Sequence, residues 1–100
     1  MAVNKVFGML GMARRAGKIK SGEFQTEAAI KDGSAALVIV AADASDNTKK
    51  KFRDSCRFYE VPYAEFGDKE TLGHAIGMEF RASLAVTDAG FAKGIQKNMA

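Results

Sequence analysis

The sequence predicts an α/β fold with helices on both faces of a single sheet. Residues 36–41 form the most apolar run, and six such residues between turn-forming segments are typical of a buried strand. A continuous apolar run also indicates a strand that is covered on both faces. Helical and strand-like patterns alternate along the chain, which places helices on both sides of the sheet. The expected elements are helix 3–15, strand 18–20, helix 23–32, strand 36–41, helix 46–60, strand 61–66, helix 67–76, strand 84–86 and helix 89–98.

The first helix is indicated by apolar side chains at helical spacing, among them Val3, Val6 and Leu10. Gly17 follows its last turn, where glycine commonly ends a helix. Residues 18–20 then alternate polar, apolar and polar side chains, which is the pattern of a short, half-exposed strand. A basic strand is therefore expected directly after the first helix.

The second helix begins after a glycine turn, and Gly22 or the serine before it can cap its start. Thr26, Ala29 and Ile30 share the apolar face of this helix. Phe24 then points in nearly the opposite direction. Two interpretations of that ring remain open. It folds back onto the first helix, or it stays exposed to a ligand.

The third helix is capped by Ser45 or the aspartate that follows it. Its buried stripe is predicted to hold Phe52, Ser55, Cys56 and Tyr59, so the cysteine is interpreted as a core residue. A single cysteine cannot form an internal disulfide, which favours a reducing, cytoplasmic location.

The remaining elements are predicted from proline and from capping residues. Pro62 cannot donate a hydrogen bond to a neighbouring strand, so either strand 61–66 lies at an edge of the sheet or its first residue is unpaired. Leu72 and Ile76 face inward from the short helix that follows. Asp88 is expected to cap the last helix.

The composition fits a single soluble domain that spans residues 1–100. Apolar residues make up 47% of the chain and charged residues 27%, which is ordinary for a globular protein. No apolar run approaches the ~20 residues that a membrane span needs. Nothing in the sequence demands more than a monomer.

Positive charge is concentrated in the first half of the chain. The formal net charge is +3, but residues 1–53 hold ten basic and five acidic side chains, whereas residues 54–100 hold five and seven. Basic asymmetry in a small domain favours a polyanionic partner. The alternative is a solvated basic face that has no partner.

Motifs of enzymes and cofactor sites are missing from the sequence. It contains no GxSxG elbow, HExxH helix, Walker loop or GxGxxG turn. Asp43 and Asp46 follow the apolar strand, where α/β proteins often place ligands, but turn and cap roles are commoner for such residues. One histidine, His74, and one cysteine argue against a structural metal site. We therefore expect no catalytic residues, no metal and no cofactor.

A nucleic-acid interface is the function that the residues favour most. Lys18 and Lys20 place cations next to Gly22, and the helix start that follows offers unpaired N–H groups to a phosphate. Gln25 carries an amide that can donate and accept at a base edge. An exposed Phe24 ring could stack on an unpaired base, which suits RNA loops better than duplex DNA. The candidate RNA-binding residues are Lys18, Lys20, Ser21, Gly22, Phe24, Gln25, Lys31, Asn47, Lys49, Lys50 and Arg81.

Several stretches of the sequence resemble those of a known family. The sequence from Lys18 through the glycine turn and the helix that ends at Gly33, with the apolar strand up to Asp43, is similar to the ribosomal L7Ae/L30e family. Residues 13–18 and 43–51 look like its bacterial YlxQ-type branch. The resemblance covers nearly the whole chain. It implies a three-layer α/β/α sandwich around a four-stranded mixed sheet. It also implies binding of kink-turn RNA, a sharply bent internal loop that presents sheared G·A pairs.

In that family a Gly-x-Asn-Glu motif at a helix start reads the bent loop. The resemblance matches Gly22 to the glycine, while Phe24 replaces the asparagine and Gln25 replaces the glutamate. A glutamine can accept a hydrogen bond from guanine, without the strength that a charge adds. Ala28 stands where archaeal kink-turn proteins commonly carry lysine. The second RNA-facing loop corresponds to residues 78–83, whose apolar side chains either pack on an extruded nucleotide or close the core.

The sequence as a whole predicts a small, non-enzymatic, ribosome-associated protein that recognises kink-turn or similarly bent RNA. The alternative is a protein-interaction module on the same scaffold, with the basic face binding an acidic partner. The replacement of asparagine and glutamate by Phe24 and Gln25 favours that alternative over kink-turn binding.

Overall fold

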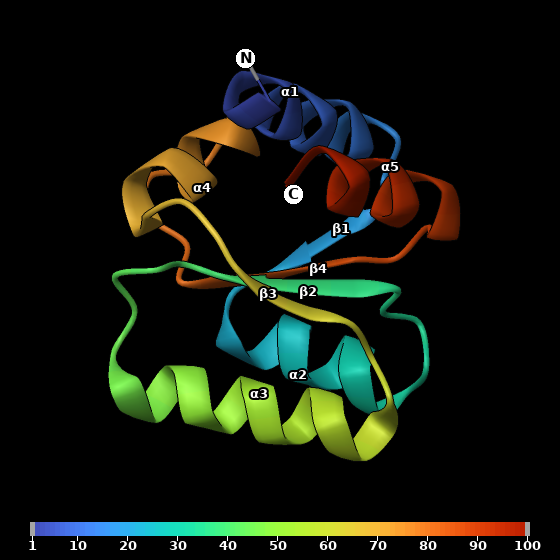
Figure 1. Ribbon diagram of the computed structural model, residues 1–100, viewed down its shortest axis with the longest axis vertical. Coiled ribbons are helices and arrows are strands. Elements are labelled where there is room, and N and C mark those ends of the chain that lie inside the picture. Colours follow the sequence, from blue (N-terminus) through green and yellow to red (C-terminus); the bar gives the residue numbers. More distant parts are fainter. Residues whose placement is uncertain (1, 100) are drawn as a thin grey trace.

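The structure, a computed structural model, describes residues 2–99 and the side chains of residues 5–99. The sheet forms the middle layer of a three-layer sandwich (Figure 1). Helices α1, α4 and α5 cover one face of the sheet, and α2 and α3 cover the other, as the resemblance implied. The elements are α1 (Ala2–Arg15), β1 (Ile19–Ser21), α2 (Glu23–Lys31), β2 (Leu37–Val40), α3 (Asp46–Tyr59), β3 (Tyr63–Glu65), α4 (Lys69–Ala75), β4 (Ser83–Val86) and α5 (Ala89–Met99).

The four strands pair in the order β1-β4-β2-β3, and the sheet is mixed. β2 is parallel to β3 and antiparallel to β4, which in turn is antiparallel to β1. β3 therefore lies at an edge, which is one of the two arrangements that Pro62 predicted. The carbonyl of Pro62 accepts a hydrogen bond from the N–H of Val38 at 2.9 Å, so proline still contributes its acceptor to the pairing.

The core is built on β2 and β4, and every residue of both strands is buried. Ile30 and Phe52 pack on the sheet from the α2 and α3 side, and Leu10 and Ile95 pack from the side of α1 and α5. Burial of each such side chain stabilises the fold by about 1.5–3 kcal/mol. The unbroken apolar run of β2 therefore reflects helix layers on both of its faces.

The predicted inward faces of the helices are confirmed for most positions. Thr26, Ala29 and Ile30 of α2 are buried, and so are Leu72 of α4 and Ile76 directly after it. The side chain of Val3, which was expected on the inner face of the first helix, lies outside the described side chains. None of the helices within residues 2–99 combines the length and apolar character that crossing a membrane requires.

The buried stripe of α3 is shorter than predicted. Phe52 and Cys56 are buried, but Ser55 is only half-buried and Tyr59 is 42% exposed, so the prediction for the tyrosine was wrong. The chain reverses at Glu60, which adopts a left-handed conformation with φ 58°. Because of that reversal the last turn of α3 lies at the border of the core. Burial raises the pKa of the Cys56 thiol to about 11, with a smaller contribution from the nearby carboxylate of Glu27.

Three helix starts carry capping side chains, and the caps of α3 and α5 are among those predicted. Ser45 Oγ accepts a hydrogen bond from an N–H of the first turn of α3 at 3.1 Å. Asp68 and Asp88 accept equivalent bonds at the starts of α4 and α5, at 2.8 and 2.9 Å. Each cap typically contributes about 1 kcal/mol. Local sequence thus fixes where these helices begin.

Truncation of the central strand should destabilise the protein strongly. We expect Ile39→Ala to lower the free energy of unfolding by about 2–5 kcal/mol, because Ile39 is fully buried and its removal leaves a cavity. The measurement is equilibrium urea unfolding. Phe24→Ala is the matched control, since Phe24 is 84% exposed and its loss should change stability by less than about 0.5 kcal/mol. Similar effects of the two variants would contradict the assignment of β2 to the core.

Candidate nucleic-acid interface

The start of α2 is accessible, and within the described residues no side chain caps it. Gly22 is the N-cap, with φ 90° and ψ 164°, a conformation that residues with a side chain rarely adopt. Its N–H donates to the carbonyl of Ser83 in β4 at 3.0 Å, which fixes the turn against the sheet. The first N–H groups of α2 can therefore bind an anion.

Phe24 and Gln25, the second and third residues of α2, point away from the core. Phe24 is 84% exposed, and Gln25 is exposed as well. The first helix, α1, lies on the opposite face of the sheet from α2 (Figure 1). The interpretation in which Phe24 folds back onto that helix is therefore wrong. Burial of the apolar face of α2 sets the rotation of the helix and leaves the Phe24 ring in solvent.

A cleft of about 360 Å³ lies where α1 ends, β1 begins and the loop before β4 passes. Arg81 donates from Nε to Ser21 Oγ at 3.1 Å, and its guanidinium donates to the carbonyl of Phe80 at 2.8 Å. These bonds hold the loop of residues 77–82 against the turn before α2. We call this site the Arg81 cleft, and it is lined by Arg14, Gly17, Ile19, Lys20, Ser21, Gln25, Met78 and Arg81.

A second hollow, of about 280 Å³, lies beside the exposed ring of Phe24. Lys20 and Gln25 line this hollow as well as the Arg81 cleft, so both side chains are placed between the two sites. Hydrogen bonds from the side chain and backbone of Ser34 lower the pKa of Asp32, which also lines the hollow. Because that carboxylate stays ionised, the hollow disfavours a phosphate and suits a neutral ring better. We call it the Phe24 groove.

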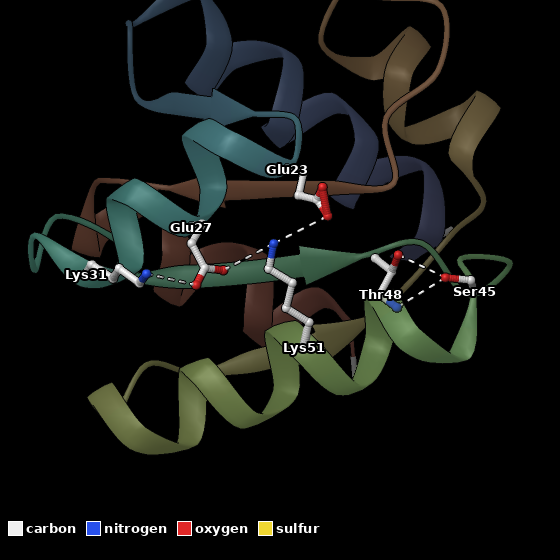
Figure 2. A network of polar contacts seen from close by, with 6 residues as sticks. All are labelled: Glu23, Glu27, Lys31, Ser45, Thr48 and Lys51. Carbon is white, nitrogen blue, oxygen red and sulfur yellow. Dashed lines mark hydrogen bonds and ion pairs between the residues drawn. The ribbon is translucent and has the colours of Figure 1, made fainter.

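Lys51 of α3 joins the third helix to the second. Its Nζ lies 3.3 Å from Glu23 Oε1 and 3.9 Å from Glu27 Oε2. Figure 2 shows the ammonium group between these two carboxylates. Glu23 is the first residue of α2 and Lys51 lies in the second turn of α3. The starts of the two helices therefore lie at the same edge of the molecule (Figure 2).

Three lysines among the candidate RNA-binding residues are already engaged in ion pairs. Lys31 and Lys50 pair with acids four residues away in their own helices, with Glu27 at 3.6 Å and Asp54 at 2.6 Å. Lys49 lies 3.8 Å from the carboxylate at the end of β3. These lysines therefore do not present unpaired charge. The two pairs within a helix contribute only about 0.3–0.5 kcal/mol each, so a phosphate can replace the carboxylate there. The role of all three lysines in RNA binding stays a prediction.

A different set of cations forms no ion pair with the residues that the structure describes. They are Arg14, Lys20 and Arg81, which line the Arg81 cleft, and Arg15 and Lys18, which adjoin lining residues in the chain. Sequence reasoning selected three of them and missed the two arginines of α1. The sequence feature that could have indicated these two arginines is their position in the last turn of α1, only a few residues before the basic strand. Net positive charge therefore lies toward α1 and the loop before β4.

The acidic residues after β2 stabilise turns and helix starts. Oδ1 of Asp43 accepts a hydrogen bond from the backbone N–H of Lys69 at 2.9 Å, where α4 begins. Asp46 and Asn47 are exposed in the first turn of α3, where an acidic group interacts favourably with the helix dipole. Within the described residues, no three histidine, cysteine, aspartate or glutamate side chains gather closely enough to hold a metal ion.

Comparison with known proteins places the chain in a family. A sequence model of the ribosomal protein L7Ae/L30e/S12e/Gadd45 family matches residues 4–95. The chain belongs to this family. The L7Ae-type match covers every element from α1 into α5, including the turn at Gly22 and the loop that carries Arg81.

Two relatives in the family are similar along most of their length. RNA-binding protein YlxQ of Bacillus subtilis (strain 168) is 46% identical over 86 residues, which are 86% of this chain and 86% of that protein. RNA-binding protein YlxQ of Enterococcus faecium is 43% identical over 89 residues, which are 89% of this chain and 85% of that protein.

Two solved structures share the architecture. A protein with unknown function from Bacillus halodurans C superposes with a TM-score of 0.92 at 38% identity, covering 95% of this chain and 96% of that one. The Giardia lamblia 15.5kD RNA binding protein superposes with a TM-score of 0.82 at 24% identity, covering 98% and 88%. At that lower identity the likeness shows the fold alone.

Proposed function

We propose that the chain binds structured RNA, with the start of α2 placed against a sharply bent internal loop of the kink-turn kind. One observation carries the proposal: the accessible start of α2 and the loop of residues 77–82 meet at the Arg81 cleft. The two similar relatives are both named RNA-binding proteins. The proposed target is ribosomal RNA or another RNA with a similar bend, bound by the monomer in the cytoplasm.

Backbone contacts supply affinity and register in this proposal. Lys18, Lys20 and Arg81 reach phosphates, together with the unpaired N–H groups at the start of α2. At Gly22 no other part of the described structure lies within 4 Å of the position that a Cβ would occupy. The space beside the turn is therefore open, and an RNA backbone can approach the peptide closely.

In this proposal Gln25 and two exposed aromatic rings recognise the bases. The Gln25 amide can donate and accept at the edges of sheared G·A pairs. Phe24 is 84% exposed and Phe80, in the second loop, is 58% exposed, so each ring can stack on an unpaired base. In the same loop Met78 is half-buried and Ser83 is buried. That loop therefore closes the core at its ends and offers the Phe80 ring to an extruded nucleotide.

A gel shift that compares a kink-turn RNA with an unbent control tests the proposal. The control has equal length, with Watson–Crick pairs in place of the sheared G·A pairs, so both RNAs carry the same charge. We expect the kink-turn RNA to bind at least about tenfold more tightly, which corresponds to one well-formed base contact. Equal binding would contradict recognition of the bend. An association in cell extract that survives nuclease treatment would instead favour the acidic protein partner.

The salt dependence of binding should identify which cations reach phosphates. With four to five phosphates contacted, log K should fall against log salt concentration with a slope of about −3 to −4. Lys20→Ala should make the slope shallower by about 0.7 to 0.9. Lys50→Ala is the matched control, and we expect a smaller change because Asp54 already pairs with Lys50 at 2.6 Å. A salt-independent affinity would argue against the entire interface.

Replacement of the glutamine amide should affect recognition more than general affinity. We expect Gln25→Ala to weaken binding of the kink-turn RNA by about 1–3 kcal/mol, because a base-edge contact is lost. Binding of the unbent control should change little, since the phosphate contacts remain. Fluorescence anisotropy with both RNAs measures the difference. An equal loss on the two RNAs would assign Gln25 to the backbone instead of a base.

A further inference from the structure

A second basic cleft, of about 380 Å³, lies between the ends of α1 and α4, on the other face of the sheet from α2 (Figure 1). We call it the Arg15 cleft, and it is lined by Gly11, Arg14, Arg15, His74, Ala75, Ile76 and Gly77. None of the residues predicted from the sequence to bind RNA lines it. Arg14 also lines the Arg81 cleft, whereas Arg15 lines only this one.

The close crossing of α1 and α4 shapes the floor of this cleft. An added Cβ at Gly11 would lie 3.2 Å from the carbonyl oxygen of Ala75 and 3.6 Å from a guanidinium nitrogen of Arg15. The first distance means that α1 and α4 approach closely at Gly11, and the second places the Arg15 side chain beside Gly11 on its own helix. Arg15 is exposed, so its guanidinium is accessible to a ligand at the cleft.

The Arg15 cleft and the Arg81 cleft form one continuous basic surface. Arg14 lines both, and Gly77 of one is followed in the chain by Met78 of the other. No described residue that lines either cleft carries a carboxylate, whereas the ion-paired lysines all belong to α2 and α3. A polyanion seated at the Arg81 cleft can therefore continue onto the α1 side without meeting negative charge in the cleft lining.

We propose that the Arg15 cleft binds backbone phosphates of the stem that flanks the bent loop, so that one RNA contacts both layers of the sandwich. The proposal rests on the proposed function. Arginine favours phosphate because its planar guanidinium donates two parallel hydrogen bonds to it. The lining holds two arginines and no phenylalanine, tyrosine or tryptophan, so we assign the cleft to the RNA backbone and not to base readout. Arg15 provides affinity for a stem, and Gln25 provides recognition of the loop.

The test compares Arg15→Gln with Arg57→Gln on two RNAs that share one bent loop and differ in the length of the flanking stem. Arg57 is exposed in the last turn of α3, as Arg15 is in α1, and it lies in the opposite layer. We expect Arg15→Gln to weaken the long-stem RNA about tenfold, as for the loss of one charge-assisted contact. Its salt slope should become shallower by about 0.7 to 0.9. The short-stem RNA, and Arg57→Gln on either RNA, should change less than about twofold.

Unfolding curves of both variants are the control, because equal stability means that any difference arises in binding. Several outcomes would overturn the proposal. If the two variants behave alike on the long stem while the wild type still prefers the bent loop, the Arg15 cleft is not used and the proposed function stands. An equal loss on both stem lengths would also exclude the stem contact. If the wild type does not distinguish bent from unbent RNA, both proposals fail together. A polyglutamate probe that loses affinity only with Arg15→Gln would assign the cleft to an acidic protein.

Discussion

The structure depends on covering β2 on both of its faces. Leu37, Val38, Ile39 and Val40 are each fully buried, so a helix layer is needed above and below the strand. The α2 and α3 layer brings two helix starts to one edge of the sheet (Figure 2). The other layer ends α1 beside β1 and places the loop before β4 against the same turn. The candidate interface is thus a consequence of how the central strand is buried.

Charged groups at this edge divide into two sets with different roles. Lys51 lies between Glu23 and Glu27 and joins α2 to α3, and Glu27 Oε2 is buried without a hydrogen-bond partner among the described residues. At 3.9 Å the ammonium group compensates the charge of that oxygen without a hydrogen bond, and Lys31, 3.6 Å from the other oxygen of Glu27, shares this role. Among the cations that line the Arg81 cleft, Arg81 fixes the loop before β4 through its hydrogen bonds, whereas Arg14 and Lys20 form no ion pair with the described residues. Cations that form no ion pair within the protein can bind a ligand without breaking a contact of the fold.

Features that depend on local periodicity could be predicted, and features that depend on tertiary neighbours could not. Burial of Thr26 and Ile30 followed from helical spacing, and the edge position of β3 was one of two arrangements that a single proline indicated. The pairing of Lys50 with Asp54 was readable as well, because the spacing of four residues puts them on one face of a helix. The meeting of Ser21 with Arg81 joins segments sixty residues apart, and no local pattern specifies it. Arg14 was missed for the same reason, since its importance comes from a cleft that three separate segments form.

The exposed Phe24 ring bears on what kind of RNA contact the start of α2 can make. A phenyl ring cannot replace the hydrogen bonds of the asparagine that the family motif carries, but it offers a face for stacking, which is worth about 1–3 kcal/mol per base. The ring borders the Phe24 groove, where the ionised Asp32 disfavours a phosphate. Lys20 and Gln25 stand between that groove and the cationic Arg81 cleft. Under the proposed function, two parts of the RNA therefore bind at different places beside the α2 start. A base lies in the Phe24 groove, and the backbone that carries it lies in the Arg81 cleft. Hydrogen-bond readout then depends on one amide, and the shape of the bent loop supplies much of the selectivity.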